Sequence, residues 1–99
     1  MDNSNFDWDD ANILHLAEHQ VSPEEAEEVV LGDPMELQFA KSAQGEDRWE
    51  YLGETVPGRF LLVVISMRGE KVRVVTAYEP IRRLKLIYLR FRQETNERF

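Results

Sequence analysis

The sequence contains no cysteine among its 99 residues. It therefore cannot form a disulfide scaffold, a thiolate zinc site or a cysteine nucleophile, and it fits a reducing compartment. Long apolar runs are also missing, because the longest, residues 60–65, is far shorter than the roughly 20 residues that a membrane-spanning helix needs. The opening segment is polar and acidic, unlike a signal peptide. These absences predict a soluble, cytoplasmic protein with no membrane contact.

The chain contains enough hydrophobic residues to form one hydrophobic core. Hydrophobic residues make up 42% of the chain and aromatic residues 10%, and a chain of this length forms about one domain. We therefore expect a single domain over residues 1–99, with residues 1–6 as a flexible terminus.

Charge is unevenly distributed along the chain. The net charge is −7, but residues 1–57 carry a net −13 and residues 58–99 a net +6. An acidic chain is a poor general binder of nucleic acid, because neutralising phosphates drives that affinity. The basic C-terminal half could still form a local phosphate-binding surface, or the two halves could simply pack together as solvated faces of opposite sign.

Two short helices are predicted before residue 35. The first begins at Asp9 or Asp10, which can cap a helix, and runs to about His19. Helical spacing places Ile13, Leu14, Ala17 and Val21 on an apolar stripe and Asn12, His15 and His19 on another face.

The second helix carries a capping box, in which Ser22 is the N-cap, Pro23 the first helical residue and Glu25 the reciprocal partner. This helix is expected to end at Gly32, since glycine commonly follows the last residue of a helix. We expect the apolar residues Ala26, Val29 and Val30 to face inward. The acids Glu24, Glu25, Glu27 and Glu28 are interpreted as a solvated face rather than a metal site.

From residue 35 the hydrophobic period changes to two, which indicates strands over about 36–40, 48–52, 60–65 and 71–78. Short turns at 43–47, 56–58 and 68–70 favour an antiparallel meander. The third strand is almost continuously apolar and should be covered on both faces. In the fourth, Val72, Val74, Thr76 and Tyr78 should face one way and Lys71, Arg73, Val75 and Ala77 the other.

The segment after Pro80 fits either a helix or a strand. A helix stripe of Ile81, Leu84, Tyr88 and Phe91, together with the segment's length, favours the helix. Leu86 and Leu89 would then lie off the stripe, where a partner or a second copy could cover them. The predicted fold class is therefore α+β, with two N-terminal helices, a four-stranded antiparallel sheet and a C-terminal helix.

A series of short motifs runs through almost the whole chain. Residues 6–12 read FDWDDAN, and His15 and His19 then precede residues 21–26, which read VSPEEA. These segments resemble the N-terminal signature of the BrnT family, which has an F-x-W-D entry, a helix with Asn and His, and a V-S/T-x-E-E-A helix.

Later segments continue the resemblance. Residues 46–49 with 52–53 are similar to the family's E-x-R-[WY]…[LI]-G strand, and residues 59–64 and 72–77 resemble its next two strands. Arg82 and Tyr88 match the R…Y pattern of its last helix. Two positions depart from the pattern. Gln20 stands where the family usually has Gly, at a helix end that prefers positive φ, and Leu84 stands where it usually has an acid.

The resemblance implies a RelE-like (ααββββα) toxin of a type II toxin-antitoxin pair in bacteria. It further implies metal-independent endoribonuclease activity that binds RNA and inhibits translation, and neutralisation by a BrnA-like antitoxin with a ribbon-helix-helix part. No cofactor or metal is expected.

Metal-free RNA cleavage needs a base, an acid and cationic groups near the phosphate. His15 and His19 suit the proton roles, since the free pKa of histidine is about 6.5. Arg48, Arg73 and Arg82 could supply positive charge, and Tyr88 could donate a hydrogen bond or stack on a base. The candidate catalytic residues are therefore His15, His19, Arg48, Arg73, Arg82 and Tyr88.

Each candidate also has a structural interpretation. The histidines could be a surface or capping pair, or an i, i+4 zinc pair for which no third ligand is evident. Arg48 and Arg73 could form surface ion pairs with Glu50 and Glu70, and Arg82 could lie on the solvent-exposed face of a helix. Trp49 and Tyr51 fit core packing better than base stacking.

Two functional hypotheses follow. The first is a BrnT-like endoribonuclease. The second is a catalytically inactive protein of the same fold that binds a partner, which the acidic composition and Leu84 favour. A structural homodimer through Leu86 and Leu89 is a weaker third.

Overall fold

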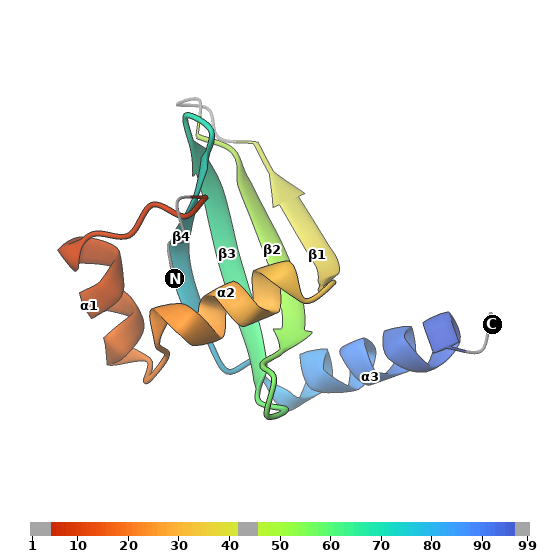
Figure 1. Cartoon of the computed structure of the whole chain (residues 1–99). Helices are drawn as coiled ribbons and strands as arrows, with labels where there is room; N and C mark the ends of the chain where they lie inside the picture. The colour runs from red at the N-terminus through yellow and green to blue at the C-terminus, as the bar shows by residue number, and fades with distance from the viewer. Residues whose placement is uncertain (1–4, 42–45, 97–99) are drawn as a thin grey trace.

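The computed structural model describes residues 5–41 and 46–96, which form three helices and one four-stranded sheet (Figure 1). In chain order the elements are α1 (Asp10–Glu18), α2 (Pro23–Leu31), β1 (Met35–Ala40), β2 (Arg48–Glu54), β3 (Phe60–Arg68), β4 (Lys71–Tyr78) and α3 (Arg82–Asn96). The predicted α+β fold and its ααββββα order are confirmed, and the ambiguous last segment is a helix.

The sheet is an antiparallel meander in the order β1-β2-β3-β4. As predicted, residues 61–66 of β3 are buried throughout, since this strand has a neighbour on each side and is covered on both faces. Gly69 takes a φ of +63° in the hairpin between β3 and β4, a conformation that glycine adopts without steric cost. The predicted turn at 43–47 falls partly on residues 42–45, outside the described residues.

Each face of the sheet has its own core. Figure 1 shows α2 crossing one face and α3 beginning at the end of β4 and extending past the sheet. On the α2 face, Ala26 and Val29 pack against Leu61 and Val63. On the opposite face, Tyr88 of α3 packs against a cluster formed by Leu52, Leu62 and Val64. Trp49 and Tyr51 pack against the first core, as expected.

The predicted inner face of α1 was wrong. Ile13 and Leu14 are 36% and 65% exposed, whereas Asn12 and Leu16 are buried. The Asn12 amide explains the orientation, because it donates to the carbonyl of Asp7 at 3.0 Å and to a β4 carbonyl at 3.5 Å. The face that carries the histidines therefore turns toward β4.

The predicted capping box of α2 is confirmed. Ser22 accepts from the Glu25 backbone and the Glu25 side chain accepts from the Ser22 backbone, and the helix ends at Gly32. The predicted solvated acidic face holds only at Glu24, which is exposed. Glu27 is buried, because it faces the N-terminal segment, where Trp8 Nε1 donates to its carboxylate at 2.6 Å.

The N-terminal segment pairs with the outer edge of the sheet. Phe6 forms a parallel bridge with Val72 of β4, and its side chain is buried in the core beneath α2. The prediction that residues 1–6 are a flexible terminus therefore fails at Phe6, while residues 1–4 lie outside the described residues. This pairing holds the segment that leads into α1 against β4.

The predicted alternation of β4 breaks at a bulge. Val64 is opposite Thr76 and Ile65 is opposite Val74, so Val75 is an extra residue. A bulge of this kind reverses the facing of every residue after it. Val74 and Ala77, predicted to face opposite ways, therefore both enter the core beneath α2.

None of the helices in the described part of the chain is long and apolar enough to cross a membrane.

Trp8→Phe should lower the free energy of unfolding, because it removes a charge-assisted hydrogen bond to the buried Glu27 carboxylate. Such bonds contribute about 1.5–3 kcal/mol. Urea denaturation followed by circular dichroism measures the loss. The matched control is Trp49→Phe, since no hydrogen bond of the Trp49 indole is present among the described residues. An equal loss in both variants would show that the hydrogen bond contributes nothing beyond packing.

Candidate functional site

A hollow of about 480 Å³ lies between α1 and the β-sheet. We call it the arginine hollow; its lining residues are Ala11, Asn12, His15, Glu46, Arg48, Arg68, Arg73, Val74 and Val75. Three of the six residues predicted from the sequence, His15, Arg48 and Arg73, come together here. Three guanidinium groups and one imidazole in one concave surface suit an anionic ligand.

Strand register brings the arginines together. Arg73 of β4 is opposite Ser66 of β3, and Arg48 of β2 precedes Trp49, which is opposite Ile65. The two arginines thus lie in one row across the sheet, on either side of β3. Arg68, two residues beyond Ser66 at the end of β3, completes the set.

Sequence reasoning missed Arg68, which it treated only as a turn residue. The signal that could have found it is its spacing of two from Ser66, since alternate residues of a strand share a face.

Acids of the N-terminal segment hold two of the arginines. Arg73 Nη1 lies 3.0 Å from Asp9 Oδ2 and 3.9 Å from Asp7 Oδ2, and Arg68 Nη1 lies 3.3 Å from the same Asp7 oxygen. The predicted pairs with Glu50 and Glu70 do not form. Arg73 pairs instead with Asp7 and Asp9, which the edge pairing carries to β4.

The Asp9 carboxylate also caps α1. Hydrogen bonds from the Arg73 guanidinium and the Asn12 backbone N–H hold the pKa of Asp9 below its ordinary value. Arg48, by contrast, makes no ion pair within residues 5–41 and 46–96, so its charge faces the hollow without an acidic partner.

His15 lies at the rim of the arginine hollow with its side chain 45% exposed. Its Nε2 is 3.0 Å from the Thr76 hydroxyl and its Nδ1 is 3.6 Å from Glu18. The ring also meets the edge of the His19 ring, with 5.3 Å between centroids. The Thr76 hydroxyl can donate or accept, and the Glu18 carboxylate lies near the other nitrogen, so the imidazole has the surroundings of a group that exchanges a proton with a ligand in the hollow.

The remaining predicted residues lie elsewhere. Arg82 is exposed at the start of α3, outside the arginine hollow. Tyr88 is 1% exposed, so no base can stack on its ring in this structure.

The Tyr88 hydroxyl donates to Glu54 at 3.1 Å and accepts from Arg92 Nε at 2.8 Å, while its ring packs on Phe60. Burial raises the pKa of Tyr88 above its ordinary value. These contacts make Tyr88 the residue that anchors α3 to the sheet.

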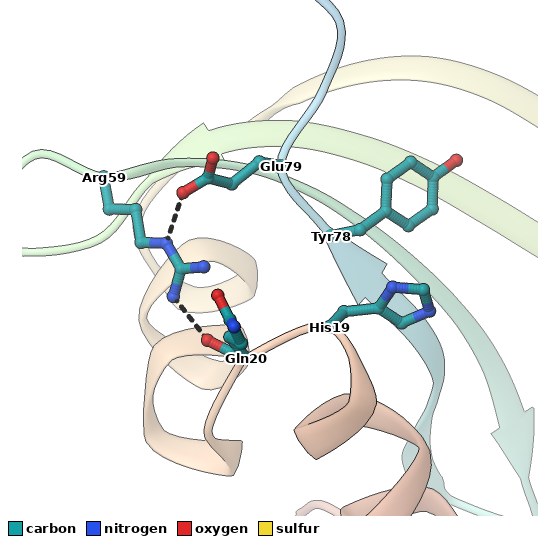
Figure 2. Close-up of a pocket in the computed structure, with 5 residues that line it drawn as sticks. All are labelled: His19, Gln20, Arg59, Tyr78 and Glu79. Atoms are coloured by element: carbon teal, nitrogen blue, oxygen red, sulfur yellow. Dashed lines mark hydrogen bonds and ion pairs between the residues drawn. The ribbon is translucent and has the colours of Figure 1, made fainter.

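His19 belongs to a second hollow, of about 440 Å³, which we call the tyrosine hollow. Its lining residues are His19, Gln20, Arg59, Tyr78 and Glu79 (Figure 2). Figure 2 shows the rings of His19 and Tyr78 on one side and the polar groups of Arg59, Glu79 and Gln20 on the other.

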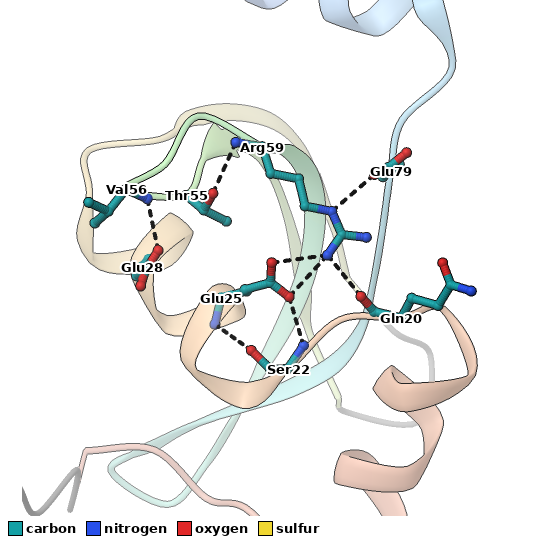
Figure 3. Close-up of polar contacts among 8 residues, drawn as sticks. All are labelled: Gln20, Ser22, Glu25, Glu28, Thr55, Val56, Arg59 and Glu79. Atoms are coloured by element: carbon teal, nitrogen blue, oxygen red, sulfur yellow. Dashed lines mark hydrogen bonds and ion pairs between the residues drawn. The ribbon is translucent and has the colours of Figure 1, made fainter.

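Arg59 binds four segments together beside this hollow (Figure 3). Its Nη1 lies 2.8 Å from the Gln20 carbonyl and 3.0 Å from both Glu25 oxygens, and its Nε lies 3.0 Å from Glu79. The Arg59 backbone N–H in turn donates to the Thr55 hydroxyl at 3.0 Å. The guanidinium therefore joins the end of α1, the start of α2 and the end of β4.

Gln20 ends α1 with a φ of +62°. Its N–H donates to the Ala17 carbonyl, and the Val21 N–H donates to the Leu16 carbonyl, which is the hydrogen-bond pattern of a Schellman motif. Val21 and Leu16 are both buried, as the motif requires. The prediction that this position prefers positive φ is confirmed, although the residue is not glycine.

The outer face of α3 carries an apolar patch. Leu86 and Leu89 are 53% and 47% exposed, which confirms that they lie off the inward stripe. With Ile87 they line a shallow groove that Arg83 and Arg90 flank.

Within the described residues, no group of three or more His, Asp or Glu side chains gathers to hold a metal ion.

The fold and the arginine hollow define a small α+β protein with a surface hollow that gathers three arginines and a histidine. A family model described as "Ribonuclease toxin, BrnT, of type II toxin-antitoxin system" matches residues 8–83. The chain belongs to this family, and its membership implies an antitoxin partner. No curated protein and no solved structure shows significant similarity to the chain.

Gln20→Gly should raise the free energy of unfolding by up to about 1 kcal/mol, because a side chain in the left-handed region carries a steric cost that glycine does not. Thermal unfolding measures the change. Gln20→Ala serves as the control, since it keeps the Cβ atom and should not stabilise. If Gln20→Gly were no more stable than Gln20→Ala, the claim that the backbone is strained at this position would be wrong.

Glu25 should make stability depend on pH. The hydrogen bond from the Ser22 backbone, assisted by Arg59, holds the pKa of Glu25 below its ordinary value of 4.5. A lowered pKa contributes stability above the unfolded-state pKa, and that contribution is lost as the pH falls through the folded-state pKa. Wild type should therefore be more stable than Glu25→Gln at pH 7, and urea denaturation curves should converge below pH 4.5. A constant difference down to pH 3 would contradict this assignment.

Proposed function

We propose that the chain is a metal-independent endoribonuclease toxin that inhibits translation in the bacterial cytoplasm, on a RelE-like fold. The observation that carries the proposal is the arginine hollow, in which His15 lies among Arg48, Arg68 and Arg73. Family membership supports ribonuclease chemistry, and the hollow supplies the residue types that such chemistry needs.

The proposed reaction places the scissile phosphate in the arginine hollow. His15 accepts the proton of the adjacent 2′-OH, whose oxygen attacks phosphorus while the bond from phosphorus to the 5′-oxygen breaks. The leaving oxygen takes a proton, for which His19, in ring contact with His15, is our candidate donor. The products are a 2′,3′-cyclic phosphate and a 5′-hydroxyl.

The arginines have separate tasks in this proposal. Arg48 has no acidic partner among the described residues, so its guanidinium can bind phosphate without first breaking an ion pair. Arg73 and Arg68 must exchange Asp9 and Asp7 for phosphate oxygens. The Arg68 side chain is 62% exposed, so its exchange costs little, whereas the Arg73 side chain is only 16% exposed and its exchange costs more. Tyr88 and Arg82 are left out of the proposed site because neither lines the arginine hollow or the tyrosine hollow that contains His19.

We propose further that a BrnA-like antitoxin with a ribbon-helix-helix part covers the apolar patch on α3. Residues 82–96 carry five basic residues and one acid, so the patch favours an acidic, apolar segment. The same charge disfavours the homodimer through Leu86 and Leu89, because it would bring two basic helices together.

The second candidate function is a binding protein without catalytic activity. Asp7 and Asp9 neutralise two of the three arginines, and the chain carries a net charge of −7. If these pairs persist, the surface would hold a protein partner rather than RNA.

Induced expression in a bacterial host should arrest growth and fragment RNA, and purified protein should cleave RNA equally well with a chelator present. His15→Ala and Arg48→Ala should each lower the cleavage rate about 100-fold or more, because they remove the base and an unpaired cation. Arg90→Ala, which removes a cation outside the hollow, is the matched control.

Circular dichroism shows whether each variant folds. Intact RNA and normal growth at good soluble expression would favour the binding protein. Cleavage that the chelator abolishes would overturn metal independence.

A further inference from the structure

The tyrosine hollow has no task in the proposed cleavage reaction beyond the contribution of His19. We propose that it is a nucleobase subsite, in which the base next to the scissile phosphate stacks on Tyr78 and turns its polar edge toward Glu79 and Gln20. This inference rests on the proposed function, because it names how the same site selects its RNA.

The two hollows are adjacent along both elements that form them. His19 caps the C-terminal end of α1, one helical turn after His15, while Thr76 and Tyr78 are two residues apart on β4. His15 contacts Thr76, and His19 lies against Tyr78 with ring centroids 5.8 Å apart. A phosphate in the first hollow therefore places its attached sugar and base toward the second.

Tyr78 offers an aromatic surface to solvent. The residue is 38% exposed at the end of β4, although the neighbouring Ala77 is fully buried. Proteins that bind single-stranded RNA commonly stack unpaired bases on such rings. The tilt of 48° between the Tyr78 and His19 rings shows that they are not stacked on each other face to face.

Gln20 gives an independent reason to expect a ligand. It keeps the left-handed conformation in a Schellman motif, where glycine would fit without strain. Its backbone carbonyl is held by Arg59, while its side chain lines the hollow. Backbone strain of this kind is concentrated at functional sites. An amide that contacts a base would explain why a strained side chain stands here.

Glu79 sets the expected preference. Arg59 Nε donates to one carboxylate oxygen, Oε2, and the other oxygen has no hydrogen bond among the described residues. A carboxylate oxygen accepts hydrogen bonds from exocyclic amino groups, which adenine, cytosine and guanine carry and uracil lacks. Uracil offers only its N3–H, which lies between two carbonyl oxygens that a carboxylate repels, so the subsite should disfavour uracil.

The test measures binding of labelled 2′-O-methyl oligonucleotides, which resist this cleavage reaction because the attacking hydroxyl is blocked. Fluorescence anisotropy with oligo(A), oligo(C) and oligo(U) should show A and C binding about tenfold more tightly than U. Tyr78→Ala should weaken binding of A and C about tenfold. Glu79→Gln and Gln20→Gly should reduce the preference over U.

Gln20→Gly separates binding from folding, because a variant that is at least as stable as wild type should still lose base preference. The control is Leu14→Ala, on the outer face of α1, where Leu14 is 65% exposed. It should leave both affinity and preference unchanged.

The outcomes separate this inference from the proposed function. If wild type cleaves RNA but binds A, C and U alike, or if the three variants keep its preference, the subsite is overturned and the nuclease stands. If base-selective binding depends on Tyr78 and Gln20 but RNA is never cleaved, the subsite stands without the catalytic proposal. Failure to bind any oligonucleotide overturns the subsite.

Discussion

The Asp9 carboxylate is the group on which the placement of α1 depends. It accepts the Asn12 N–H that begins the helix and the Arg73 guanidinium that projects from β4, so one side chain both starts α1 and fixes it to the sheet edge. Asn12 adds a second link through its amide. These contacts place the walls of both hollows, which lie where α1 and the residues after it meet β4. Buried Leu16 and the contact between His15 and β4 hold α1 there as well, so the helix keeps its place when Arg73 turns to a ligand.

Acids of the N-terminal half pair with arginines of the C-terminal half. They are therefore not simply a cluster of like charges that repel one another. Asp7, Asp9 and Glu25 each lie against an arginine of the basic half. The interpretation of two packed faces of opposite sign is thus correct at these contacts, and it does not conflict with a local phosphate site. A ligand oxygen can take the place of a carboxylate oxygen on a guanidinium that is already oriented, which keeps the cost of ordering the arginine low.

Short-range sequence patterns were sufficient to predict the type and order of the helices and strands. The capping box of α2, the turn at Gly69 and the continuous apolar run of β3 depend on neighbours in sequence, so they could be predicted. The inner face of α1 could not, since a nine-residue helix with apolar groups on several sides is oriented by Asn12, whose partner carbonyl lies 62 residues away. The β4 bulge and the burial of Glu27 likewise depend on pairing across the chain.

The candidate site shows the same division. His15, Arg48 and Arg73 could be named from residue type and resemblance. Arg68 and its partner Asp7 could not, because they are brought together by strand register and the edge pairing of Phe6. Tyr88 shows the converse, because a motif match located a tyrosine that the structure uses to anchor α3. Gln20 needed both the sequence and the structure. The resemblance shows that glutamine is unusual at this position, and the structure adds that its φ is positive and that it lines the tyrosine hollow. A residue kept against its backbone preference, beside an exposed aromatic ring and one helical turn from the cationic hollow, is better explained by a ligand than by the stability of the helix that it ends.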